Sequence, residues 1–262
     1  MRLGAALDLN AWRGRAPVWV GLAAVGALSW FYLAHMHAGP SGMVDGMALH
    51  AMGTKGVGLN EFLAAFVMWS AMMVAMMLPT AVPAVSLFLM LSGRRNPAQA
   101  PAATTAMYGA GYLAIWIGYS VPAALAQGVL TEAALLTPVA ASTSDLMSAL
   151  ILLAAGIFQF MPLKTACLTK CRSPLAFFLA EWRDGKTGAF VLGLRHGSYC
   201  VGCCWALMAV LFVVGVMNLA SMALLAAFLL GEKVVPARWH LSRISGAILI
   251  AWGMWIATGL WQ

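Results

Sequence analysis

The chain has 262 residues, of which 63% are hydrophobic and 9% are charged, and its mean hydropathy is +0.87. A soluble domain carries about 25% charged residues, so this composition excludes a water-soluble globular protein. The formal net charge of +7 does not require a nucleic-acid partner, because the basic residues flank long apolar segments. The composition instead predicts an all-α polytopic transmembrane helix bundle that forms a single domain over residues 1–262.

Apolar runs of about 20 residues are long enough to cross a hydrocarbon core about 30 Å thick. We predict about seven spans, at 17–34, 61–91, 105–127, 145–162, 197–217, 219–235 and 244–261. The second span contains Pro79 and Pro83 and is expected to kink there. The short connection between the fifth and sixth spans predicts a tight helical hairpin.

The distribution of basic residues predicts the orientation. If the spans alternate, 14 of the 15 Lys and Arg residues fall on one side of the membrane, and only Lys55 falls on the other. By the positive-inside rule the crowded side is cytoplasmic, so the N-terminus lies in the cytoplasm and the C-terminus lies outside, in the periplasm. The predicted location is the bacterial inner (cytoplasmic) membrane, with the first span retained as an anchor.

The predicted outer loop, 35–60, is rich in soft and borderline metal donors. Within 18 residues it contains His35, Met36, His37, Met43, Met47, His50 and Met52. Histidine and methionine suit copper in an oxidising compartment, and the single acid, Asp45, makes this a poor site for Ca²⁺ or Mg²⁺. Two interpretations stay open: a copper-capture segment, or a glycine-rich linker with incidental histidines.

The second predicted span contains the methionine-rich stretch MWSAMMVAMML. Its methionines form two adjacent pairs with i,i+4 spacing, extended by one turn; they are Met68, Met72, Met73, Met76 and Met77. Thioethers hold a soft ion in an apolar medium without the cost of burying carboxylates, and this chemistry favours Cu(I), with Ag(I) as a mimic. Ordinary gap-filling by methionine is the alternative.

All five cysteines fall at the predicted cytoplasmic side. Cys167 and Cys171 lie in the predicted inner loop, 163–195, where Lys164 and Lys170 would favour their thiolate forms. In a reducing compartment, clustered thiols indicate metal binding or redox chemistry more than structural disulfides.

The stretch HGSYCVGCCW places an imidazole and three thiols on one helix face. At about 100° per residue, these four side chains fall within an arc of about 100°; they are His196, Cys200, Cys203 and Cys204. Gly197 and Gly202 keep the adjoining surface open to another helix or loop. Zn²⁺ is the alternative to Cu(I) at this Cys/His cluster.

Three stretches resemble an uncharacterised bacterial family of predicted metal-binding integral membrane proteins. They are MWSAMMVAMMLPTAVP, QFMPLKTACLTKCRSPL and WRDGKTGAFVLGLRHGSYCVGCCWALMAVLFVVGVMNLA, and the likeness covers about residues 61–262. The resemblance implies a metal role for the methionines of the second span and for all five cysteines. It supplies neither the metal nor a reaction.

These patterns favour a protein that binds Cu(I) and transports or delivers it across the inner membrane. The alternatives are a membrane thiol–disulfide oxidoreductase using Cys200–Cys203 with Cys167–Cys171, and a metallochaperone or assembly factor for another membrane complex. The sequence contains no nucleotide-binding loop, so we expect a metal-binding protein more than an enzyme. The expected partners are the lipid bilayer, the soft metal ion and a metallochaperone or membrane complex; seven helices do not require an oligomer.

Overall fold

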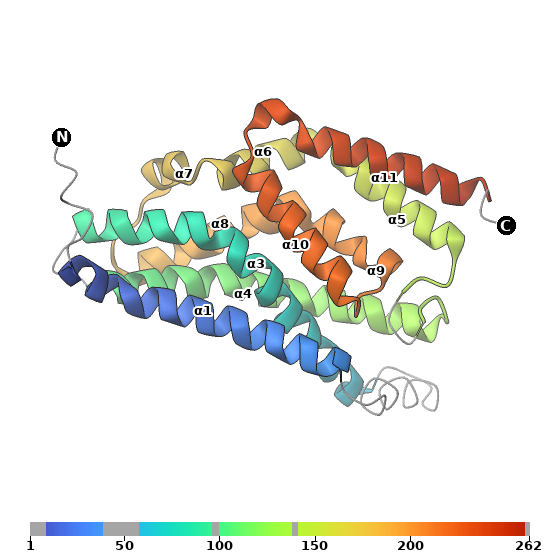
Figure 1. Cartoon of the computed structure of the whole chain (residues 1–262), viewed down its shortest axis with the longest axis horizontal. Coiled ribbons are helices and arrows are strands. Elements are labelled where there is room, and N and C mark those ends of the chain that lie inside the picture. The colour runs from blue at the N-terminus through green and yellow to red at the C-terminus, as the bar shows by residue number, and fades with distance from the viewer. Residues whose placement is uncertain (1–8, 39–57, 96–99, 138–140, 260–262) are drawn as a thin grey trace.

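The computed structural model describes residues 9–38, 58–95, 100–137 and 141–259, and within these ranges it is a bundle of helices without a β-strand (Figure 1). Leu136 and Ser142 form an isolated bridge. The helices, in chain order, are α1 (Leu9–Ala38), α3 (Leu59–Arg95), α4 (Pro101–Glu132), α5 (Asp145–Phe158), α6 (Pro162–Arg172), α7 (Pro174–Glu181), α8 (Gly185–Ala209), α9 (Leu211–Val214), α10 (Leu219–Val234), η2 (Ala237–Trp239) and α11 (Leu241–Ala257). The predicted all-α class is confirmed.

Four helical segments in the described part of the chain are long and apolar enough to cross a membrane. They are Ala16–Met36 within α1, the whole of α3, the whole of α4, and Gly185–Val214, which combines α8 and α9. Two further candidates are pairs of helices joined at a sharp bend. The chain bends by 64° between α5 and α6, and by 120° between α10 and the segment formed by η2 and α11. The count is therefore four, or up to six if each bent pair is one span, and the predicted seven spans are not confirmed.

The difference in span number comes from the two bent pairs. Each predicted span from 145 onward contains a helix, but α5 has only 14 residues and α10 has 16. At about 1.5 Å per residue, both fall short of the hydrocarbon thickness. Figure 1 shows the chain changing direction after α10, so that α11 runs toward the right-hand end of the molecule.

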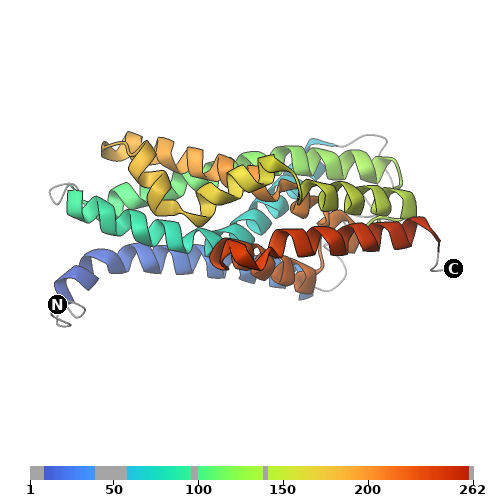
Figure 2. The ribbon, with the colours of Figure 1, turned by 90° about the horizontal axis from the view of Figure 1, so that it is seen from above.

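The two ends of the described chain lie at opposite ends of the long axis. In both views α1 begins at the left and α11 finishes at the right (Figures 1 and 2). Helix α3 continues through Pro79 and Pro83 to Arg95, and Figure 1 shows its direction changing along its length, as a proline-containing helix allows.

The segment predicted as an inner loop is helical. It contains α6, α7 and the first turns of α8, which begins at Gly185, 12 residues before the predicted start of that span at 197. The predicted span began too late because charged residues such as Arg195 were placed in a loop; Arg195 lies in the helix and pairs with Glu181 of α7 at 2.9 Å. Cys200 therefore lies well inside α8 and not in its first turn.

Helix α7 packs on the bundle through one face, while Leu175 and Leu179 on its other face are exposed. Phe177 and Phe178 are fully buried, and Phe178 packs edge-on against Phe88 of α3. The helix is an integral part of the bundle, because its aromatic side chains find other protein side chains to pack against.

Helices α4 and α8 approach each other closely because glycine occupies the contact. A Cβ atom on Gly193 would overlap the carbonyl oxygen of Tyr108, and one on Gly111 would overlap that of Phe190. Small residues allow this backbone-to-backbone packing in membrane helices. The close approach sets Tyr108 and Tyr112 of α4 against the face of α8 that carries His196 and Cys200.

Candidate metal centre

The five cysteines come together from two helices. Cys167 and Cys171 lie on α6, and the other three, Cys200, Cys203 and Cys204, lie on α8; all five are free thiols. The thiol of Cys171 lies close enough to interact with Cys200 and Cys203. The Sγ of Cys167 lies over Gly202, where a Cβ atom would be only 2.9 Å from it. The two cysteine groups of α6 and α8 therefore lie next to each other in the fold.

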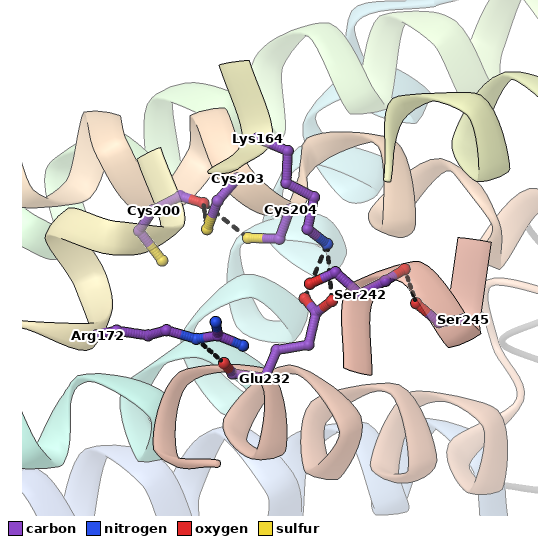
Figure 3. Close-up of polar contacts among 8 residues, drawn as sticks. All are labelled: Lys164, Arg172, Cys200, Cys203, Cys204, Glu232, Ser242 and Ser245. Carbon is purple, nitrogen blue, oxygen red and sulfur yellow. Dashed lines mark hydrogen bonds and ion pairs between the residues drawn. The ribbon is translucent and has the colours of Figure 1, made fainter. Parts of the chain in front are cut away.

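The thiols of Cys203 and Cys204 share one acceptor. Both donate to the carbonyl oxygen of Cys200, at 3.1 Å and 2.7 Å respectively (Figure 3). All three α8 cysteines are buried, with no more than 1% of each residue exposed. Their hydrogen-bonding needs are met within the helix that carries them.

The sulfur of Cys200 contacts a basic side chain that the sequence analysis had not assigned to the site. The Nζ of Lys233, at the end of α10, lies 2.9 Å from this sulfur and 2.7 Å from the Oγ1 of Thr80 on α3. The Tyr112 hydroxyl lies 3.1 Å from the same sulfur. An adjacent ammonium group favours the thiolate, which is the form that binds metal.

The lysine proposed from sequence to act on the thiols has another partner. Lys164 is buried and its Nζ lies 2.8 Å and 2.9 Å from the two carboxylate oxygens of Glu232 on α10 (Figure 3). Arg172 donates from Nε to the backbone carbonyl of Glu232 at 2.6 Å. Although Lys164 and Cys167 are only three residues apart on α6, the long lysine side chain reaches the carboxylate of Glu232 on α10. The neighbouring residues Glu232 and Lys233 thus join α10 to α6 and to α8.

The methionine stripe is buried within the bundle and is linked to the thiol cluster at one end. All five side chains are inside, at 1% exposure or less: Met68, Met72, Met73, Met76 and Met77. The Oγ1 of Thr80 lies 3.9 Å from the Sδ of Met77 and bonds to Lys233, which contacts Cys200. Tyr112 also donates to the carbonyl oxygen of Met77 at 3.4 Å. The inner end of the stripe is therefore linked to the sulfur of Cys200 through Thr80, Lys233 and Tyr112.

His196 is buried on the same face of α8, as its phase predicts, but its ring is engaged by aromatic neighbours. The Nδ1 atom forms a hydrogen bond with the Tyr108 hydroxyl. The ring also packs near Tyr112 and Phe177. The imidazole is held in place by α4 and α7 instead of pointing freely toward the thiols.

The predicted outer ligands lie mostly outside the described residues. Four of them, His50, Met43, Met47 and Met52, lie outside the described ranges, and so does the side chain of His37. His35, near the end of α1, is exposed and stacks on Phe31, while Met36 is partly buried. The capture role of this segment stays a prediction.

Among the described residues, no group of three or more His, Cys, Asp or Glu side chains is arranged as a ready-made metal site. The contacts above explain this. Two thiols are turned to the carbonyl oxygen of Cys200, and the third sulfur faces Lys233 and Tyr112. The donors are gathered, but they are hydrogen-bonded to protein groups.

Four residues of this site were missed by the sequence analysis: Thr80, Tyr108, Tyr112 and Lys233. Lys233 carried a signal, because an ionisable residue at the end of an apolar helix marks a functional site by default. The tyrosines and the threonine carried none, since their role depends on how α3 and α4 pack against α8.

Comparison with known proteins supplies the family. Residues 66–256 match a family model described as "PpoB2: Copper chaperone". A search of curated proteins and a search of solved structures each found no match. The matched residues include the methionine stripe and all five cysteines, and they exclude the outer His/Met segment. Because the match covers well over half of the chain, this protein belongs to the PpoB2 copper chaperone family.

Proposed function

We propose that the protein is embedded in the bacterial inner membrane, binds Cu(I) at the five-thiol cluster and delivers it to an acceptor protein. The observation that carries this proposal is the meeting of α6 and α8 thiols at a point to which the buried thioethers of α3 are also linked. Membership of a copper chaperone family supports the metal and the delivery role. The apolar helices support the membrane location.

The donor set favours Cu(I) over Zn²⁺. The cluster offers thiols and thioethers, which are soft ligands, and Cu(I) accepts low coordination numbers with such donors. A structural Zn²⁺ site needs four ligands in a tetrahedron. The buried thioethers of α3 would have no role in such a site, because zinc is held by thiolate and imidazole ligands.

Charge balance gives Lys233 a role in this proposal. Binding by two thiolates converts Cu(I) into a complex with one net negative charge, and burying an uncompensated charge in a membrane protein is costly. The ammonium group at 2.9 Å from Cys200 compensates that charge. For one of the two α8 thiols to join Cys200 as the second ligand, that thiol must release the Cys200 carbonyl and lose its proton to solvent.

Metal analysis of the purified full-length protein tests the proposal. After loading with Cu(I) under reducing conditions and removal of free metal, the wild-type protein should retain copper with sulfur neighbours in its X-ray absorption spectrum. The triple variant Cys200→Ser, Cys203→Ser, Cys204→Ser should lose it. Ser198→Ala on the exposed face of α8 is the matched control and should retain it. Equal copper in the triple variant and the wild type would overturn the proposal.

A second candidate function, movement of Cu(I) across the membrane, is favoured by one observation. The buried stripe from Met68 to Met77 runs along α3 and is linked at its inner end to Cys200, so it could serve as a relay of thioethers. Proteoliposomes distinguish the two functions, because a transporter accumulates copper in sealed empty vesicles and a chaperone without a transport cycle does not. Thiol–disulfide chemistry would leave this stripe without a role.

A further inference from the structure

The five thiols differ in their access to the surroundings. Cys167 is partly exposed, whereas Cys171 is 8% exposed and the three cysteines of α8 are at 1% or less. A metal ion held by buried sulfurs can leave only by exchanging ligands one at a time, and the first external donor must reach a sulfur at the surface. Only one of the five thiols meets that condition.

The exposed side of α6 carries several polar residues, with the exposed Leu163 on the face of Cys167 as the main apolar one. Thr165 and Thr169 are exposed, and Lys170 is partly exposed. The exposed residues of α5 are instead large and apolar, such as Leu146 at 70% and Ile157 at 57%. A surface that faces lipid is expected to carry such large apolar residues. The contrast indicates that this part of α6 faces water or a polar partner.

Cys167 is also connected to the buried thiols. Its sulfur lies against Gly202 of α8, the residue that precedes Cys203. Any side chain at position 202 would collide with this sulfur, so the glycine is what allows α6 to bring Cys167 next to the cluster. An ion bound at Cys167 would thus be one step from Cys203.

We infer that Cys167 is the exchange ligand through which Cu(I) enters and leaves the buried thiols, by transfer to and from a thiol-bearing copper carrier. On entry, the Cys167 thiol loses its proton to solvent and forms a bond from its sulfur to copper. One copper–sulfur bond to the carrier then breaks, and the carrier thiolate takes up a proton. Copper stays Cu(I), so no electron donor or acceptor is needed. The inference rests on the proposed function and adds the route to it.

Release kinetics test the exchange role. The copper-loaded wild-type protein in detergent is mixed with an excess of a water-soluble Cu(I) chelator, and copper release is followed by absorbance. Cys167→Ser should bind copper in the wild-type amount but release it at least about tenfold more slowly, because the chelator loses the sulfur at which it first exchanges with the protein. Ala166→Ser, an exposed neighbour on α6, is the control for a new hydroxyl and should release copper at the wild-type rate.

A second variant tests the geometry with all five thiols present. Gly202→Ala should displace Cys167 from α8 and slow release to a similar degree, whereas Gly118→Ala, which meets open space on α4, should not. Wild-type release rates in both Cys167→Ser and Gly202→Ala, or complete loss of bound copper in Cys167→Ser, would overturn the inference while leaving copper binding established. A wild-type protein that holds no copper would instead refute the proposed function itself.

Discussion

The Nζ of Lys233 lies 2.9 Å from the Sγ of Cys200, and this contact brings the end of α10 to the middle of α8. The same ammonium group reaches the Oγ1 of Thr80 on α3 at 2.7 Å. Three helices that are far apart in the sequence therefore meet at one sulfur atom. Because the basic group is a fixed part of the fold, the charge environment of this sulfur does not depend on solvent ions.

Replacing Lys233 by methionine should weaken copper binding. The change removes the positive charge that offsets the negative copper–thiolate complex, and we expect affinity to fall by about tenfold or more, or about 1.4 kcal/mol. Lys233→Arg keeps the charge and should recover part of the affinity. Competition with a calibrated Cu(I) chelator measures the effect.

Lys186→Met serves as the control for Lys233→Met, since this lysine is exposed near the start of α8. Its affinity should match that of the wild type. An unchanged affinity in Lys233→Met would show that the ammonium group does not stabilise the bound ion.

Breaking the ion pair between Lys164 and Glu232 should destabilise the bundle. Both side chains are at 2% exposure or less, so Glu232→Leu alone leaves a buried ammonium without a counter-charge, at a cost of about 3–5 kcal/mol. The double variant Lys164→Met, Glu232→Leu removes both charges and should recover most of that loss. Thermal unfolding in detergent, followed by circular dichroism, makes the comparison; equal midpoints for the two variants would contradict it.

Gly193→Ala should disrupt the contact between α4 and α8. The added methyl group would overlap the Tyr108 carbonyl, so the helices must separate and carry Tyr112 away from Cys200. We expect both a lower unfolding midpoint and lower copper occupancy. Gly109→Ala, which meets open space on α4, should leave both quantities unchanged. Equal behaviour of the two variants would show that the glycine contact is unimportant.

Replacing Met72 and Met76 by leucine separates packing from metal transfer. The swap keeps hydrophobicity and nearly keeps volume, so it should change the free energy of unfolding by less than about 1.5 kcal/mol per site. If thioethers relay copper, accumulation in proteoliposomes should fall to the level of empty vesicles, while copper bound at the thiols stays at the wild-type amount. Wild-type accumulation in a well-folded double variant would assign these methionines to packing alone.

Local patterns in the sequence were enough to predict several parts of this molecule. Hydropathy predicted helices at seven places, and each contains one. Helical phase placed His196 and the three α8 cysteines on a common buried face. The prediction that Gly197 and Gly202 admit close neighbours is confirmed, because Gly197 packs against Ile115 of α4 and Gly202 against Cys167. These features depend on spacing within one element.

Features that depend on contacts between distant elements were not predictable. The reversal between α10 and α11 is a tertiary arrangement, and hydropathy alone shows two apolar segments there. The assignment of Lys164 to the thiols was wrong because its true partner, Glu232, comes from a helix 68 residues away along the chain. The burial of Gln159 is a further example: its side chain lies inside the bundle, and neither of its polar atoms has a hydrogen-bond partner within the described part of the chain.

The carbonyl oxygen of Cys200, which accepts hydrogen bonds from two thiols, affects how the protein behaves after its metal ion leaves. Many small metalloproteins unfold when the metal leaves, because their ligands have no other favourable interaction. Here the sulfurs that lose a cargo ion can return to an acceptor in their own backbone, so the empty form needs no substitute metal to keep its shape. A carrier with this property can be emptied and refilled repeatedly without refolding.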